Sequence, residues 1–143
     1  MNKLRVIAAA LCAAFFSTSA MAGGATHLIG TWKGAVHGAV IGVDTHHEGK
    51  NEQEVRFVRT EFTIVIDKVE GQNFSGYHFS RNRKEAIIGA VRSDMKSGVY
   101  VDGDGILLFE LVSNDMLETC YAHAATHSKE GSAVVSCAEL IRQ

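Results

Sequence analysis

The segment 30–42 reads GTWKGAVHGAVIG and alternates between two kinds of position. Its even positions carry only glycine, tryptophan and valine, whereas its odd positions include Lys33 and His37. Glycine at every fourth residue also fits a helix interface, but these two polar residues interrupt the long apolar span that such an interface needs. On a strand the same spacing puts Gly30, Gly34, Gly38 and Gly42 on one face, where they allow tight bending and close backbone approach. The segment therefore predicts the first strand of a small barrel.

The rest of the chain continues this pattern, because short apolar runs alternate with clusters of turn-forming residues. The clusters lie at 44–51, 70–73, 81–84, 93–97, 102–105, 113–115 and 126–132. They leave eight segments of strand length, and the short connections favour hairpins. The chain has no proline and no linker-like stretch. We therefore predict one all-β domain, an antiparallel up-and-down β-barrel of about eight strands.

One strand contains a change of apolar phase. Phe62, Ile64 and Ile66 alternate with Thr63, Val65 and Asp67, but Val55 and Phe57 occupy the opposite phase. A β-bulge inserts one residue and reverses the alternation. The pattern therefore predicts a bulge near Arg59.

The first residues have the layout of a secretory signal peptide. Lys3 and Arg5 precede an apolar run over 6–16, and Ala20-Met21-Ala22 forms a small-x-small cleavage site. The run is much shorter than the roughly 20 residues of a membrane-spanning helix. We expect removal of 1–22, including Cys12.

Several expectations follow for the mature chain 23–143. It is periplasmic or secreted, does not span the membrane, and has a formal charge that moves from −2 to −4 because two basic residues leave with the leader. This acidity disfavours a nucleic-acid partner, which needs a basic surface. Only Cys120 and Cys137 remain, and export favours a disulfide between them.

That disulfide would fix the register of the last hairpin. If the two cysteines bond across neighbouring strands, Glu118 faces Glu139 on the outer wall. Such a pair is either an acid or metal site or simply two solvated glutamates. The same register turns Tyr121, His123 and Ser136 inward, and with Val36 and Val40 of the first strand they are our candidate ligand-binding residues.

The ends of the barrel carry a resemblance. Gly30-Thr31-Trp32 resembles the Gly-x-Trp signature of lipocalins and of the wider calycin group, which includes avidins. In that group a basic residue of the final strand packs across the tryptophan, which implies a structural contact between Trp32 and Arg142. The sequence differs from that group in two ways that bear on function. One tryptophan is too few for an avidin-type biotin site, and the Thr-Asp-Tyr type motif of true lipocalins is missing. The resemblance implies a calycin-like barrel without naming a ligand.

Motifs for metal binding and catalysis are weak or incomplete in this sequence. His46 and His47 are weak metal candidates, because adjacent residues on a strand point in opposite directions and no second pair completes a site. Asp102-Gly103-Asp104-Gly105 lacks the later ligands of a calcium loop and is explained as a hairpin turn. The chain has no nucleophile elbow and no phosphate loop. We therefore expect no cofactor, no metal and no enzymatic activity.

These observations lead to two functional hypotheses. The glycine row and the mixed lining favour an exported, non-enzymatic barrel that binds a small apolar or amphipathic ligand. The alternative is an envelope interaction protein, such as a protease or lysozyme inhibitor, with a filled barrel that binds its partner through the long 43–54 loop. An outer-membrane barrel is disfavoured, because the chain lacks a terminal aromatic residue and aromatic girdles.

Overall fold

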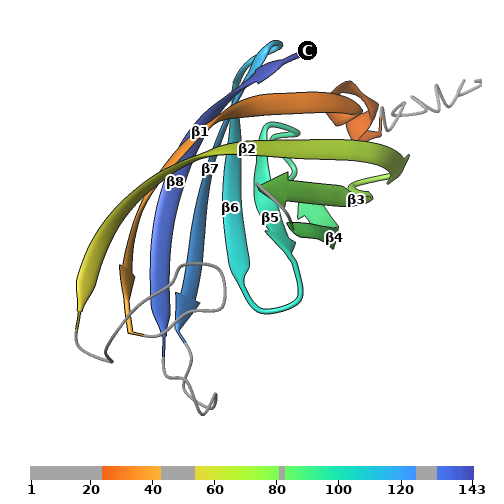
Figure 1. The fold of residues 1–143 in the computed structure, drawn as a ribbon. Helices are drawn as coiled ribbons and strands as arrows, with labels where there is room; N and C mark the ends of the chain where they lie inside the picture. Colours follow the sequence, from red (N-terminus) through yellow and green to blue (C-terminus); the bar gives the residue numbers. More distant parts are fainter. Residues whose placement is uncertain (1–23, 43–53, 81–82, 125–131) are drawn as a thin grey trace, which may run out of the picture.

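The computed structural model describes residues 24–42, 54–80, 83–124 and 132–143. Eight antiparallel strands close into a barrel in sequence order, as Figure 1 shows. A 3-10 helix precedes them, and the elements are η1 (Ala25–Leu28), β1 (Gly30–Ile41), β2 (Val55–Glu70), β3 (Asn73–Ser80), β4 (Arg83–Val91), β5 (Ser97–Val101), β6 (Ile106–Ser113), β7 (Met116–Ala124) and β8 (Ala133–Arg142). The predicted all-β, eight-stranded antiparallel barrel is confirmed. Within the described ranges, no helix is both long and apolar enough to cross a membrane.

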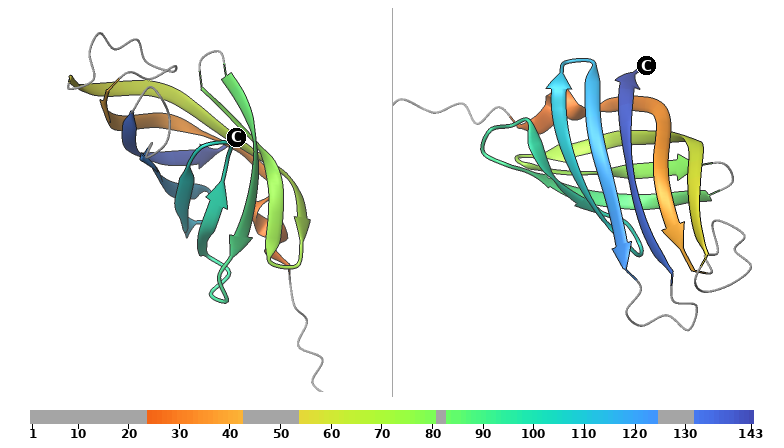
Figure 2. Two further views of the ribbon diagram at one scale, coloured as in Figure 1. Left: turned by 90° about the horizontal axis from the view of Figure 1, so that it is seen from below. Right: turned by 90° about the vertical axis from the view of Figure 1, so that its left-hand side faces the viewer.

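The two longest strands curve around the barrel, and Figure 2 shows β1 and β2 wrapping from one end to the other. The bulge predicted near Arg59 is wrong, because the β1–β2 register continues without a shift from Gly30↔Ile66 to Ile41↔Val55. Val55 and Phe57 instead stay on the outer face, where they are 56% and 85% exposed. The change of apolar phase reflects an apolar patch on the outside, not an inserted residue. The register of β2 shifts later, between Ile66 and Lys68 against β3.

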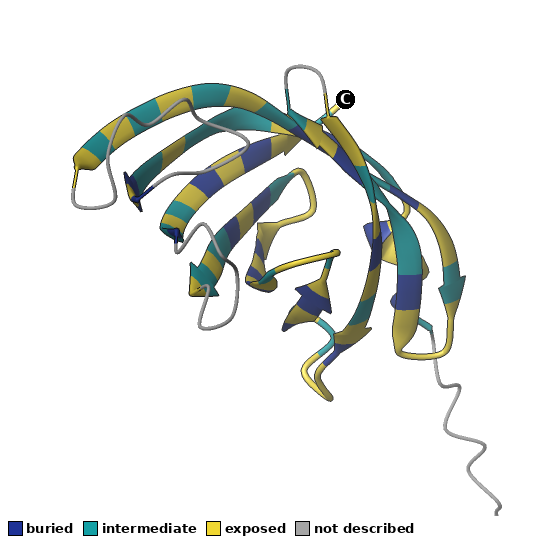
Figure 3. Cartoon of the chain, turned by 60° about the horizontal axis from the view of Figure 1, so that its bottom comes forward, coloured by how far each residue is buried: buried dark blue, intermediate teal, exposed yellow. Residues whose placement is uncertain are grey.

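Inward-facing side chains are fully buried at the end of the barrel that η1 covers. Figure 3 shows the alternation of buried and exposed residues along the strands. Leu28 of η1 lies over Trp32, whose indole Nε1 donates to the Leu28 carbonyl at 3.0 Å. Both residues are 0% exposed, and Ile64 and Leu140 complete the packing with 1% and 0%. We call this half of the interior the closed half.

The Gly-x-Trp segment closes the barrel through Arg142. Gly30 has a φ of +149°, and a Cβ there would lie 2.8 Å from Arg142 Nη1. Glycine thus admits the guanidinium group, whose Cζ lies 4.0 Å from the centroid of the Trp32 ring. The same group donates to the carbonyls of Ile29, His27 and Asn114 at 2.8, 2.7 and 3.0 Å. The first and last strands are therefore joined by one planar cation.

Arg142→Lys is expected to lower the free energy of unfolding by about 1–2 kcal/mol. Lysine keeps the charge but cannot supply three donors in one plane, and a cation–π contact alone is worth about 0.5–2 kcal/mol. Urea denaturation followed by far-UV circular dichroism measures the change. The matched control is Arg59→Lys on the exposed outer face of β2, which should change stability by less than about 0.5 kcal/mol. Equal effects of both variants would contradict a special role for Arg142.

The glycine row of β1 marks the line along which β1 and β8 approach closely. A Cβ at Gly34 would collide with the Glu139 carbonyl of β8, and one at Gly38 would lie 2.8 Å from the Cβ of Ser136. The row therefore accommodates the neighbouring strand, as glycine in a coiled strand does. The glycines do not by themselves account for a ligand cavity.

The last hairpin has the register that the cysteines predict. Cys120 and Cys137 are directly opposite one another and form a disulfide, with their Cα atoms 4.1 Å apart. The same pairing places Glu118 opposite Glu139. The conditional register argument is therefore confirmed by the structure.

Candidate functional site

The second half of the interior differs from the closed half in its exposure. At the end where β1, β3, β5 and β7 finish, some inward-facing residues retain contact with solvent, whereas Val40 and His78 are buried. Thr60 and Phe62 of β2, Tyr121 of β7 and Ser136 of β8 are all half-buried. We call this region the open half. Its inner wall combines apolar side chains with polar ones, which is the usual character of a small-molecule site.

A cluster of three ionisable side chains lies in the open half. His78 of β3 is directly opposite Glu85 of β4, and its Nε2 lies 3.3 Å from Glu85 Oε2. The same nitrogen lies 3.5 Å from Oδ2 of Asp102, which follows β5. The side chains of His78 and Asp102 are only 7% and 2% exposed. The Phe62 ring covers the imidazole, with 5.1 Å between centroids.

The surrounding structure orients both carboxylates of this cluster. Asp102 Oδ1 accepts the backbone N–H groups of Asp104 and Gly105 at 3.1 and 2.7 Å in the β5–β6 turn. Glu85 Oε1 pairs with Arg83 at 3.1 Å. Each carboxylate therefore uses one oxygen to hold its position and presents the other to His78.

Tyr121 and His123 lie beside the same turn. The Tyr121 hydroxyl donates to Asp104 Oδ1 at 3.0 Å, and His123 Nδ1 lies 2.6 Å from the Asp104 carbonyl oxygen. Burial raises the pKa of the Tyr121 hydroxyl well above its ordinary value, and the carboxylates of Asp104, Asp102 and Glu85 raise it further. Tyr121 is consequently a neutral hydrogen-bonding group at physiological pH.

The other candidate residues are placed as follows. Ser136 is directly opposite Tyr121 and beside Gly38. Val36 is half-buried and packs against the core, whereas Val40 is buried at 1% exposure. Their role in ligand binding stays a prediction. His46 and His47, with the rest of 43–53, lie outside the described residues.

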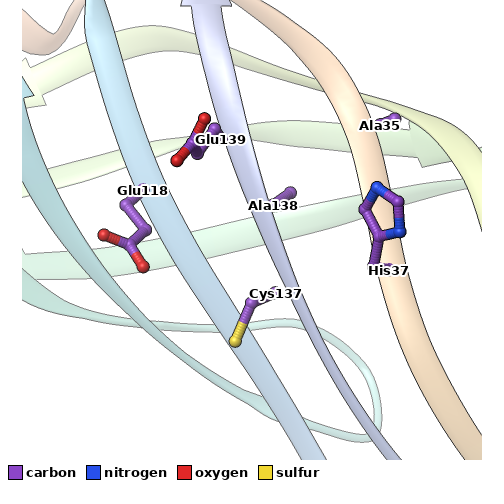
Figure 4. A pocket seen from close by; sticks show the side chains of 6 residues that line it. All are labelled: Ala35, His37, Glu118, Cys137, Ala138 and Glu139. Atoms are coloured by element: carbon purple, nitrogen blue, oxygen red, sulfur yellow. The ribbon is translucent and has the colours of Figure 1, made fainter.

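The outer wall carries a groove lined by Ala35, His37, Glu118, Cys137, Ala138 and Glu139. Figure 4 shows that these residues come from the adjacent strands β1, β7 and β8. Among the described residues, the one set of three potential metal ligands whose donor atoms all lie within 4.8 Å is His78, Glu85 and Asp102. The outer glutamates do not form such a set with His37, which favours the solvated alternative for the pair.

Sequence reasoning missed the His78 cluster, although one signal was available. A hairpin centred in the turn cluster 81–84 brings residues on either side of it into register, and His78 with Glu85 is one such pair. Asp102 was explained as a turn residue, and the turn is real. The other carboxylate oxygen of Asp102, Oδ2, points into the barrel toward His78.

Comparisons with known proteins give a structural likeness. Neither a protein-family model nor a curated protein matches this chain. Among solved structures, the S-type phycobiliprotein lyase CPES from Guillardia theta is similar, with 10% identity and a TM-score of 0.40 over 83% of this chain and 90% of that one. The name of that protein identifies it as a lyase, and the prediction that this chain is not an enzyme is therefore not retained. A likeness of this degree assigns no reaction to the chain.

Proposed function

We propose that this chain is an exported barrel that binds a small amphipathic ligand in the open half of its interior. The single observation that carries the proposal is the difference between the two halves: Trp32 and Leu140 are 0% exposed, whereas Tyr121 and Ser136, which also face inward, remain half-buried. An inner wall that keeps contact with solvent leaves room for a guest molecule.

The lining suggests what such a guest would be. Val36 and Phe62 supply apolar surface, while the Tyr121 hydroxyl and the Ser136 side chain supply hydrogen-bonding groups. A ligand with an apolar body and a polar end matches this distribution. The Cys120–Cys137 disulfide is compatible with the periplasmic or extracellular location that the leader sequence predicts.

Ser136→Phe is expected to weaken binding of an apolar fluorescent probe, such as anilinonaphthalene sulfonate, at least tenfold. The added ring would fill the space between β8 and the inward faces of β1 and β7. The matched control is Ile141→Phe on the same strand, which points outward, is 45% exposed and lies away from the apolar patch of Phe57 and Val135. This control should bind the probe as the wild type does.

A second inward variant protects the test against misfolding. Thr60→Phe fills the open half from β2, and Arg59→Phe is its outward neighbour. Circular dichroism establishes that each variant is folded before titration. Probe binding that responds equally to inward and outward substitutions would place the guest outside the barrel and refute the proposal.

The interaction hypothesis is a second candidate, and one observation favours it. Ile41, Val55, Phe57 and Val135 form an exposed apolar patch on the outer wall where β1 and β2 leave for the 43–53 segment. Exposed apolar patches often mark protein interfaces. Native mass spectrometry of the purified protein distinguishes the two functions. A small-molecule adduct supports the ligand-binding barrel, and a bound protein supports the interaction with an envelope partner.

A further inference from the structure

We propose that His78, Glu85 and Asp102 form a binding site for a divalent cation of the zinc class inside the open half of the barrel. The proposal goes beyond ligand binding by the barrel and does not depend on it. It starts from one imidazole nitrogen and two carboxylate oxygens that converge within 4.8 Å. Imidazole and carboxylate are both good ligands for zinc.

The two distances from His78 Nε2 match those between neighbouring ligand atoms of a metal site. A tetrahedral site with bonds of about 2.0–2.1 Å places neighbouring donor atoms about 3.3–3.4 Å apart. His78 Nε2 lies 3.3 Å from Glu85 Oε2 and 3.5 Å from Asp102 Oδ2. The Nε2–Glu85 contact is also within hydrogen-bond range, but a strong charge-assisted hydrogen bond would be shorter, at about 2.7–2.9 Å.

The outer contacts of the cluster resemble those that orient metal ligands. Glu85 Oε1 is held by Arg83 at 3.1 Å, and Asp102 Oδ1 is held by the Gly105 N–H at 2.7 Å. Partners of this kind fix the carboxylates so that the remaining oxygens face one point. The site has three protein ligands, which leaves a fourth position for water or for a donor atom of a bound molecule.

The imidazole supplies an independent observation. His78 Nδ1 is buried and has no hydrogen-bond partner among the described residues. If Nε2 carried a proton to serve both carboxylates, Nδ1 would be buried without a partner, either as a bare lone pair or, in the doubly protonated ring, as an N–H group. If Nδ1 carries it instead, the Nε2 lone pair faces two carboxylate oxygens without a cation between them. A metal ion on Nε2 removes that repulsion and turns the lone pair into a ligand.

The test is zinc titration of the purified protein after chelator treatment and dialysis, by competition with a fluorescent zinc indicator. We expect one site with a dissociation constant in the micromolar range or below. His78→Gln, Glu85→Gln and Asp102→Asn should each weaken it at least tenfold. The last two keep the oxygen that bonds Arg83 or the turn amides, so they disturb the fold least.

A matched control and a second readout keep the outcome decisive. Glu118→Gln removes a carboxylate from the outer groove and should leave zinc affinity within about twofold of the wild type. X-ray absorption of the zinc-loaded wild type should show one imidazole with oxygen ligands, which requires no variant to fold. No binding below 100 µM, unchanged affinity in the three variants, or a spectrum of several imidazoles would each overturn the proposal. None of these results affects the Ser136 test of ligand binding, which uses no metal.

Discussion

Trp32→Ala is expected to lower the free energy of unfolding by about 3–5 kcal/mol, the range for removal of a large buried aromatic side chain. The ring is 0% exposed, donates a hydrogen bond to the Leu28 carbonyl and carries the Arg142 guanidinium on its face. Its loss leaves a cavity beneath η1 and removes the contact that joins the first strand to the last. Because domains are stable by only about 5–15 kcal/mol, the variant should be partly unfolded at moderate temperature.

Urea denaturation measures this change, and two controls define it. Trp32→Phe keeps most of the volume but loses the indole donor, so it should cost clearly less than the alanine variant. Ile141→Ala lies on the outer face of β8, with 45% exposure, and should cost little. A loss below about 1 kcal/mol for Trp32→Ala would mean that the closed half is not packed as described.

Removal of the disulfide is expected to cost about 3 kcal/mol. Cys120 and Cys137 are separated by 17 residues in the sequence, and a cross-link that closes a loop of this length restricts the unfolded chain by roughly that amount. The double variant Cys120→Ala with Cys137→Ala avoids a free thiol. Its midpoint in urea should move to a lower concentration.

The reduced wild type provides the matched comparison. It has the same side chains without the covalent bond, so its stability should fall close to that of the double variant. If the double variant is as stable as the oxidised wild type, the bond contributes nothing to the folding equilibrium. If only the double variant is destabilised, side-chain packing at the two positions is the cause.

The barrel could be predicted because its signals are local. Turn clusters and apolar alternation in each strand identified the eight segments, and the pair Cys120 and Cys137 gave the register of the last hairpin. The contact between Trp32 and Arg142 was implied by the resemblance to the calycin group, and the structure contains it. The bulge near Arg59 failed because alternation alone does not tell an inner apolar face from an outer one, and Phe57 is 85% exposed.

The site in the open half could be predicted only in part. Tyr121, His123 and Ser136 were assigned inward positions from the register of their own hairpin. His78, Glu85 and Asp102 come from three different segments, and Asp102 joins the other two because it follows β5, which pairs with β4. Their convergence depends on the stagger of the strands around the barrel, which no single segment of sequence encodes.

The pairing of β1 with β8 has a consequence for how this chain folds. The first strand acquires its second neighbour only when the final one is present, so closure of the barrel requires a pairing between the two ends of the chain. Topologies of this kind fold slowly, typically in milliseconds to seconds, because the entropy of a long loop must be lost before the contact forms. Until the C-terminus is available, the closed barrel cannot form.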